Sequence, residues 1–580
     1  MNIKNMNIPR PEFPRPQLVR DTWMNLNGKW DFLFDFGNSG CARGLMNGDV
    51  FDSGDVREIT VPFCPESRLS GIGYTDFIAA VWYRRHFEIS EKQLRGRVLL
   101  HFGAVDYRCV VWINGREVGS HRGGYSSFTF DITDAAAVGD NVIVVYAADD
   151  LRSMTQPYGK QSVSYHSQGC SYTRTTGIWQ TVWLEFVPEN YIESVKITPF
   201  PADGRVRIDT RIHGGGTLRA RAAYGGKEVG NACAETVYGN ASVEMTLDEL
   251  HLWNVGKPEL YDLELTLGDD SAASYFGMRS VELHPDGLYI NGKPVFMRLI
   301  LDQGFNPEGI YTAPSDEFLK RDIELSMELG FNGARLHQRV FEERSLYWAD
   351  RLGYIVWGEY ASADRLQDAR GVGDFLPEWL EVLERDYSHP AIIGWCPENE
   401  TYWRRGVTSV CEEIYYQVTK QIDPYRPVID ASGGVHYRTD MFDIHEYEQD
   451  VESFRKKFAV MTDDKAAVHN PPYTYEIGQE KYEGQPYWVS EYGGTLWNPV
   501  DNGWGYGTAP KTEEEFAERY SGLTSVLLKH PRICGFCYTQ LTDIEQEQNG
   551  LYAYDRSRKF SDAVYEIIKE TNTKKAAIEK

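Results

Sequence analysis

The chain has 580 residues, of which 42% are hydrophobic and 25% are charged, and its formal net charge is −25. This length exceeds one ordinary hydrophobic core, so we expect roughly three domains. The negative charge argues against nucleic acid and an anionic membrane surface as partners. The polar, Pro-rich start Met1–Arg20 lacks the apolar core of a signal peptide, and no later run has the length of a membrane span. With nine scattered cysteines, which indicate free thiols, the sequence predicts a cytoplasmic protein.

The first third of the chain has the pattern of β-structure. Short alternating or apolar runs are separated by turn residues, without helical periodicity. These runs are Lys29–Phe34, Val81–Ile89, Val98–Phe102, Cys109–Ile113, Asn141–Ala147 and Thr181–Phe186. They predict a jelly-roll-like β-sandwich over residues 1–187. After the hinge-like Pro188–Asn190, a second strand-rich stretch predicts an immunoglobulin-like β-sandwich over residues 188–284.

From residue 285 the pattern changes to alternating strands and helices. Ser315 is placed to cap a first helix, and further helices are expected at Glu343–Gly353, Glu378–Ser388, Ser409–Ile422, Glu513–His530 and Phe560–Thr571. With the intervening apolar strands, this makes about eight βα units, which predicts a (β/α)8 TIM barrel over residues 285–580. The segment Val451–Gly484 is expected to be a long active-site loop.

Polar side chains gather at the carboxyl ends of the predicted barrel strands, where barrel enzymes place their chemistry. In chain order they are Asp302 and Gln303, Arg335 and His337, Trp357 and Glu359, Glu398 to Glu400, Asp430, His445 to Tyr447, Glu491 and Tyr492, and Gln540, Thr542 and Asp543. Carboxylates on different strands of one rim suit glycoside hydrolysis, in which one protonates the leaving oxygen and the other attacks the anomeric carbon.

Two of these strand ends carry specific motifs. The fourth reads Trp395–Thr401 (WCPENET) and the seventh reads Trp488–Gly494 (WVSEYGG). Both resemble the signatures of glycoside hydrolase family 2, the family of β-galactosidases, β-glucuronidases and β-mannosidases. Further stretches similar to that family are Leu26–Trp30, Gly177–Gln180, His389-Pro390 and Ile290–Pro294, so the resemblance covers essentially the whole chain.

The resemblance implies a retaining exo-β-glycosidase, most similar to a β-galactosidase. It assigns Glu400 as the acid/base, Glu491 as the nucleophile, and Asn399 as the residue that hydrogen-bonds the sugar 2-hydroxyl. We expect the pKa of Glu400 to be raised by its neighbours, because a general acid must hold its proton near neutral pH. The remaining residues expected to bind substrate are Asp302, Arg335, His337, Glu359, His445, Tyr447, Trp488 and Gln540.

Several positions depart from the family pattern and leave alternatives open. Glu398 could itself be the acid, or it could pair with Arg404 or Arg405. Gln540 replaces an aromatic sugar platform, which leaves Trp357, Trp395 and Trp488 as stacking candidates or as core residues. The Asn-x-Lys clamp of β-glucuronidases is absent from Glu547–Gly550, which disfavours a uronic acid unless another cation serves. An arabinopyranoside, uronide or mannoside, or a role in carbohydrate binding without catalysis, stay as alternatives.

The first domain and the histidines add further hypotheses. The loop Ser164–Arg174 either reaches over the barrel, where Tyr172 and Arg174 would shape the pocket, or packs between domains. His445, His337 and Asp302 could bind a metal, but relatives need none, so we expect neither metal nor cofactor. Asp302 could alternatively cap its own loop. Relatives often form dimers or tetramers, and a homo-oligomer is therefore left open.

Overall fold

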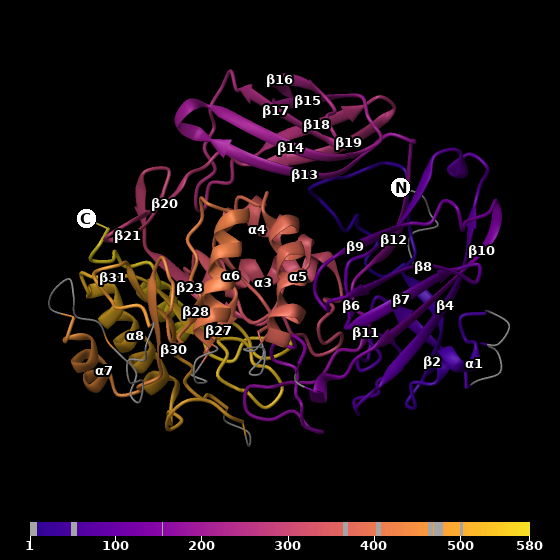
Figure 1. The fold of residues 1–580 in the computed structure, drawn as a ribbon. Coiled ribbons are helices and arrows are strands. Elements are labelled where there is room, and N and C mark those ends of the chain that lie inside the picture. The colour runs from indigo at the N-terminus through magenta and orange to yellow at the C-terminus, as the bar shows by residue number, and fades with distance from the viewer. Residues whose placement is uncertain are drawn as a thin grey trace.

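The computed structural model describes residues 8–47, 51, 55–153, 155–362, 369–401, 408–461, 468, 479–498 and 503–579. Three domains follow one another along the chain (Figure 1). The first, in indigo to purple, lies beside the barrel, and the magenta second domain lies above it. This architecture confirms the predicted fold: two β-sandwiches followed by a TIM barrel.

The first domain is a sandwich of two antiparallel sheets, with strand orders β1-β12-β5-β9 and β3-β2-β4-β10-β7-β8. Alternation along the strands buries one face of each sheet: Trp30 and Phe32 are buried, while Asp31 between them pairs with Arg84 on the other face. The strands are β1 (Trp23–Asn25), β2 (Gly28–Phe34), β3 (Arg57–Val61), β4 (Ala80–Ile89), β5 (Arg97–Phe102), β7 (Arg108–Ile113), β8 (Arg116–Arg122), β9 (Phe128–Asp131), β10 (Gly139–Ala148) and β12 (Val182–Val187).

The second domain has the two-sheet arrangement of an immunoglobulin-like sandwich, with strand orders β13-β14-β17 and β16-β15-β18-β19. The bounds are β13 (Tyr191–Phe200), β14 (Arg205–His213), β15 (Thr217–Tyr224), β16 (Lys227–Glu235), β17 (Asn240–Thr246), β18 (Tyr261–Leu267) and β19 (Asp270–Phe276). Strictly alternating burial along β17 and β18 directs one face of each strand into the core between the sheets.

The barrel is a curled parallel sheet with strand order β26-β25-β24-β23-β31-β30-β29, and the short pair β27–β28 continues it between β26 and β29. Its strands are β23 (Met297–Asp302), β24 (Gly333–Leu336), β25 (Ile355–Glu359), β26 (Ile392–Cys396), β27 (Glu398–Asn399), β28 (Ala431–Ser432), β29 (Phe442–Glu446), β30 (Tyr487–Gly493) and β31 (Ile533–Thr539). The helices are α3 (Asp316–Glu328), α4 (Glu343–Leu352), α5 (Ala369–Asp386), α6 (Thr408–Ile422), α7 (Val451–Phe458), α8 (Glu513–Lys529) and α9 (Asp562–Asn572). No helix in the described part of the chain has the length and hydropathy of a bilayer-spanning segment.

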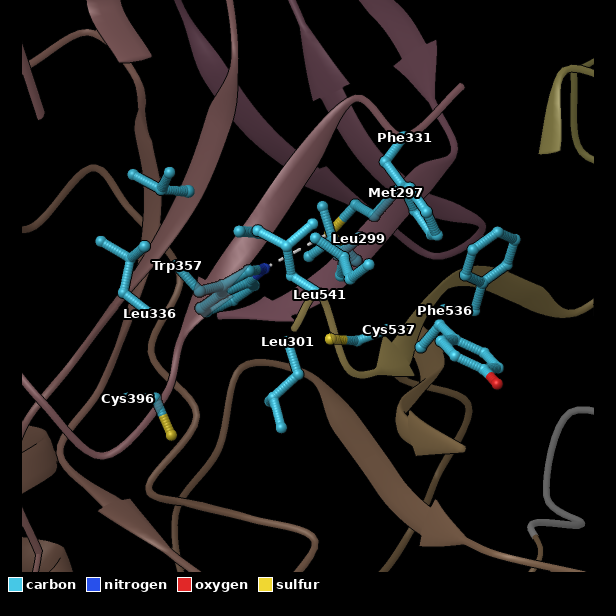
Figure 2. Packing of buried hydrophobic residues seen from close by; sticks show 14 of the residues in the cluster. Met297, Leu299, Leu301, Phe331, Leu336, Trp357, Cys396, Phe536, Cys537 and Leu541 are labelled. Atoms are coloured by element: carbon cyan, nitrogen blue, oxygen red, sulfur yellow. Dashed lines mark hydrogen bonds between the residues drawn. The ribbon is translucent and has the colours of Figure 1, made fainter. Parts of the chain in front are cut away.

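Large apolar side chains fill the barrel interior (Figure 2). Met297, Leu299 and Leu301 project from β23 beside Trp357 of β25, whose Nε1 lies 3.5 Å from the Met297 sulfur. Trp488 of β30 stacks on Trp357 with ring centroids 5.6 Å apart. The interior is therefore a packed floor, and polar chemistry is left to the rim above it.

Two helices differ from their predicted bounds. The helix expected at Glu378–Ser388 begins nine residues earlier, at Ala369, and contains Pro377. The expectation of a loop throughout Val451–Gly484 is wrong at its start, because α7 occupies Val451–Phe458. Asp450 caps that helix by accepting from the Ser453 amide, and Phe454 and Phe458, four residues apart, are buried on one face. Residues 462–467 and 469–478 of the predicted loop lie outside the described residues.

An N-terminal segment, residues 8–20, joins the three domains. The Arg10 guanidinium donates to both carboxylate oxygens of Glu342 in the barrel, at 3.0 and 2.7 Å. Arg20 pairs with Asp270 of the second domain at 2.8 Å and with Glu185 of the first at 2.7 Å. These charge-assisted hydrogen bonds are buried. Together they fix the three domains relative to one another.

Candidate active site

Glu400 and Glu491 meet at the carboxyl-terminal rim of the barrel. Glu491 lies within β30, and Glu400 directly follows β27. A carboxylate oxygen of Glu400, one of Glu491 and a ring nitrogen of His445 all lie within 4.8 Å of one another. Carboxyl groups about 5–5.5 Å apart are typical of retaining glycosidases, whereas inverting enzymes need about 6.5–9.5 Å. The nearest oxygens of the two carboxylates therefore lie at a spacing that suits a retaining pair better than an inverting one.

The Glu491 carboxylate is held as an anion. Arg335 Nη1 donates to Oε1 at 2.9 Å and the Tyr447 hydroxyl donates to Oε2. Burial alone would raise the pKa of Glu491, but His445, His337 and Arg335 outweigh it and lower the pKa. Arg335 is itself fixed by Glu359, so the carboxylate is both charged and oriented.

Glu400 shares a hydrogen bond with His445. The His445 Nδ1 lies 2.7 Å from Glu400 Oε1, and its Nε2 lies 3.4 Å from Glu491 Oε1. Although burial opposes it, this bond lowers the pKa of Glu400, while the two carboxylates raise the pKa of His445. The expectation of a raised pKa for Glu400 is therefore wrong for this arrangement, because the histidine competes for the proton.

Asn399 presents a free donor to the site. Its Oδ1 accepts a hydrogen bond from Arg335 Nη2 at 2.9 Å, which fixes the orientation of the amide. Its Nδ2 is buried and has no hydrogen-bond partner among the described residues. A buried donor without a partner is costly, so a hydrogen-bond acceptor of a ligand would relieve it.

The structure does not bring Asp302 to the carboxylate pair. Met297, Leu299 and Leu301 face the barrel interior, so alternation turns Asp302 toward the outer layer. There its Oδ1 accepts from the Gly304 amide at 2.8 Å, and burial, with Asp322, raises its pKa to about 6. This geometry corresponds to the loop-capping alternative.

The three candidate tryptophans and Gln540 are buried and already make contacts within the protein. Trp357, Trp395 and Trp488 are at most 1% exposed and form part of the core. Gln540 is buried, accepts from Gln303 at 2.6 Å and donates to Asn549 at 2.8 Å.

Glu398 does not take part in the pair. Its Oε2 accepts from the Thr401 hydroxyl at 3.1 Å, and burial, together with Asp430, raises its pKa to about 8. Its expected partners Arg404 and Arg405 lie outside the described residues. No described contact joins Glu398 to Glu491, whereas Glu400 lies beside Glu491, so Glu400 is the favoured partner of Glu491.

Sequence reasoning missed an aromatic wall formed by residues after β30. The Tyr506 ring stacks on Tyr447 with centroids 3.4 Å apart, and Trp504 lies 5.2 Å from Tyr506. The Tyr506 amide donates to the Gly494 carbonyl at 2.8 Å, which holds the wall against the end of β30. The alternating glycines and aromatic residues of 503–507 (GWGYG) are the sequence feature that could have indicated this wall.

The loop Ser164–Arg174 of the first domain reaches the barrel rim through Tyr172. The Tyr172 hydroxyl donates to Glu547 and accepts from Gln303 Nε2, which lies 2.9 Å away. The Arg174 side chain stays within the first domain. Its guanidinium donates to carbonyls there, including Ser162 at 3.0 Å and Thr75 at 2.5 Å. The site thus contains residues from two domains.

The same rim group could geometrically hold a metal. Glu400, His445 and Glu491 are the described residues whose ligand atoms lie close enough together for an ion. Each already has protein partners: Glu400 and His445 bond each other, and Arg335 and Tyr447 bond Glu491.

Three family models match consecutive parts of the chain. They are described as the sugar binding domain of glycosyl hydrolases family 2 at residues 73–187, glycosyl hydrolases family 2 at residues 190–279, and the TIM barrel domain of that family at residues 281–520. The chain belongs to glycoside hydrolase family 2. It is a glycoside hydrolase of a retaining family, in agreement with the spacing of its two rim carboxylates.

Curated relatives of this family-2 enzyme carry two different activities. A β-glucuronidase of Rattus norvegicus is 26% identical over 483 residues, which is 74% of this chain and 71% of that protein. A β-galactosidase of Thermoanaerobacter pseudethanolicus is 27% identical over 395 residues, covering 63% of this chain and only 50% of the relative. A Formosa agariphila relative, 28% identical over 345 residues, is matched over 40% of its length.

Solved structures similar to this family-2 enzyme span the whole chain. A β-glucuronidase of an uncultured Clostridium species has a TM-score of 0.80 at 19% identity, covering 97% of this chain and 100% of its own. The Ruminococcus gnavus β-glucuronidase in complex with D-glucuronic acid has a TM-score of 0.79 at 18% identity, with the same coverage. At this identity the likeness establishes the fold.

Proposed function

We propose that this family-2 enzyme is a retaining exo-β-glycosidase in which Glu491 is the nucleophile and Glu400 is the acid/base. The observation that carries the proposal is the pair of carboxylates, with oxygens within 4.8 Å of each other. The partners of Glu491 support its role, since Arg335 and Tyr447 keep it anionic and aimed. The walls formed by Tyr172 and Tyr506 suit a site that encloses one terminal sugar.

The reaction proceeds by two displacements. Glu491 attacks the anomeric carbon as Glu400 gives its proton to the glycosidic oxygen, so the bond to the aglycone breaks and a glycosyl-enzyme ester forms. Glu400 and His445 share that proton across their hydrogen bond, in which His445 Nδ1 lies 2.7 Å from Glu400 Oε1. Glu400 then takes a proton from water, which attacks the ester and releases the sugar with net retention. The Asn399 amide donates to the sugar 2-hydroxyl during both steps.

For the sugar, the comparisons support a β-linked uronic acid ahead of β-galactose. The β-glucuronidase of Rattus norvegicus is matched over 71% of its length. The β-galactosidase of Thermoanaerobacter pseudethanolicus is matched over only 50% of its length. The sequence disfavoured a uronide because residues 547–550 contain no lysine. A cation supplied from elsewhere removes that objection, and a galactoside stays the second candidate.

The test is hydrolysis of a panel of aryl β-glycosides: glucuronide, galacturonide, galactoside, arabinopyranoside and mannoside. We expect one class to be cleaved with release of the β-anomer, observed by proton NMR before mutarotation. Glu491→Gln and Glu400→Gln should lose on the order of 10⁴-fold in kcat, since the catalytic groups act as a unit.

Glu398→Gln is the matched control. It alters a buried carboxyl two residues from Glu400 and should keep most of the activity, because Glu398 contacts Thr401 rather than the pair. Release of the α-anomer, or loss of activity in Glu398→Gln with activity kept in Glu400→Gln, would contradict the assignment. Turnover of no β-glycoside would refute the function.

A further inference from the structure

Lys160 is a cation at the active site that the proposed reaction does not use. It belongs to the first domain, but its backbone is pinned over the barrel rim. The preceding Gly159 amide donates to the Ser362 carbonyl at 3.1 Å, and the Lys160 carbonyl accepts from the Tyr172 amide at 2.8 Å. Ser362 follows β25, and Tyr172 bonds Glu547 beyond β31. Lys160 thus lies between two segments that are anchored on different parts of the rim.

The approach of this loop to the barrel is close. At Gly159, φ is +56°, and an added Cβ would lie 2.2 Å from the Gln338 carbonyl oxygen just beyond β24. Only glycine fits both the backbone conformation and the contact. The sequence therefore favours a tight approach of Lys160 to the catalytic rim at this point.

The Lys160 ammonium faces negative groups without pairing with any of them. Burial alone would lower its pKa, but Cys170, Glu400, Glu491 and Glu547 raise it. Among the described residues it makes no ion pair and no hydrogen bond. Lys160 is half-buried, so an ammonium that faces several carboxylates without an ion pair of its own is placed to receive an anionic ligand.

Other cations near the rim are already occupied. Arg335 bonds Glu359, Glu491 and Asn399. Arg339 donates to the carbonyls of Gly304 and Tyr311.

The barrel loop that follows β31, residues 540–550, makes hydrogen bonds at the rim but contains no lysine or arginine. Glu547 accepts from Tyr172 and from Asn549, the latter at 2.9 Å. Within the described residues, Lys160 is therefore the site cation that has no partner.

We propose that Lys160 binds the carboxylate of a terminal β-linked uronic acid in the pocket above Glu400 and Glu491. The inference rests on the proposed function and narrows its substrate class to sugars with a negative charge. It also makes the first domain part of the specificity pocket, since the recognising charge comes from that domain rather than from the barrel. A sulfate ester on the sugar shares the same charge and is separated by experiment.

The kinetic test compares wild type with Lys160→Met and Lys160→Arg on aryl β-glucuronide, β-galacturonide, β-galactoside and 6-O-sulfo-β-galactoside. Met keeps the length and apolar stem of the side chain without its charge. We expect kcat/KM for the uronide to fall by about 10- to 150-fold in Lys160→Met, since a hydrogen bond to a charged group contributes that much. Neutral glycosides should change by less than about threefold, and Lys160→Arg should restore part of the uronide activity.

A binding test separates this inference from the catalytic proposal. D-glucuronate and D-glucose are titrated calorimetrically into Glu491→Gln, with and without Lys160→Met. We expect D-glucuronate to bind more tightly than D-glucose and to lose that preference with Lys160→Met. Lys227→Met, in the second domain, controls for loss of a lysine, and the thermal melt of each variant controls for folding.

Each outcome of the two tests supports or refutes the role of Lys160. Equal losses on acidic and neutral glycosides, or no loss on either, overturn the inference. Cleavage of the sulfated galactoside alone, dependent on Lys160, overturns the carboxylate assignment. If no glycoside is turned over, the proposed function fails, yet Lys160-dependent binding of D-glucuronate still supports the anion site and its absence refutes it.

Discussion

Replacing His445 with glutamine should change the pH profile of the enzyme more than its structure. His445 bonds Glu400 at 2.7 Å and faces Glu491 at 3.4 Å, Arg335 at 3.4 Å and the Ser432 hydroxyl at 3.3 Å. Glu400 and His445 therefore titrate as a pair, and one proton on the pair is needed for acid catalysis. The alkaline limb of kcat/KM reports loss of that proton.

The direction and size follow from the groups that hold the proton. The pKa of His445 is raised above its usual 6.5 by Glu491 and Glu400, although burial opposes this, so the wild-type pair keeps its proton above pH 6.5. In His445→Gln the proton can reside only on Glu400, and buried catalytic carboxyls of this kind titrate at about 6. The alkaline limb should therefore move to lower pH by at least about half a unit, roughly a threefold or larger additional loss on the alkaline side.

The assay is kcat/KM against pH from 4 to 10 with an aryl glycoside of a poorly acidic phenol. A 2,4-dinitrophenyl glycoside, whose leaving group needs little protonation, should show a smaller effect. His389→Gln is the matched control, because His389 is also a buried histidine beside a carboxylate, but its partner is Asp350 at 2.6 Å rather than Glu400 or Glu491. An alkaline limb that stays in place in His445→Gln would refute the shared-proton reasoning.

Two further outcomes follow from buried hydrogen bonds. Tyr447→Phe removes the donor to Glu491 and should lower kcat/KM by about 10- to 150-fold and move the acid limb to higher pH; an unchanged profile would exclude that role. His436 lies 2.7 Å from Asp430 and 3.1 Å from Asp443, which raise its pKa to about 10 against the opposing effect of burial. Because the folded pKa exceeds the unfolded one, its contribution is full below about pH 6.5 and is lost as pH rises through about 10. His436→Gln should thus cost roughly 3–5 kcal/mol at pH 6 and much less at pH 10.5 in thermal melts, and equal losses would contradict this.

Strand periodicity predicted the barrel and its rim well, because apolar strands and capped helices are local features. It placed Arg335 and His337 together correctly, since residues two apart on a strand share a face. The same rule, applied to Met297, Leu299 and Leu301, would have turned Asp302 outward. The motif residues Glu400 and Glu491 were named from resemblance, and the structure brings both to one rim.

Other features of the site could not be read from the alternation of residues. The pairing of β30 contains register shifts between Val489 and Tyr492, so Trp488 can face the barrel floor while Glu491, three residues later, still reaches the site. The His445–Glu400 bond joins two strands far apart in sequence, and the pKa of Glu400 depends on it. Lys160 lies in another domain, and only the docking of that domain shows which barrel residues it faces.

The ion pairs of the N-terminal segment set an order of events during synthesis. Arg10 and Glu342 are separated by 332 residues. At about 5–20 residues per second, Glu342 is made roughly 17–66 s after Arg10. During that interval the first two domains can fold, while Arg10 waits in solvent for its partner in the barrel. The segment that precedes the first sandwich is thus fixed in place only after the barrel has been made.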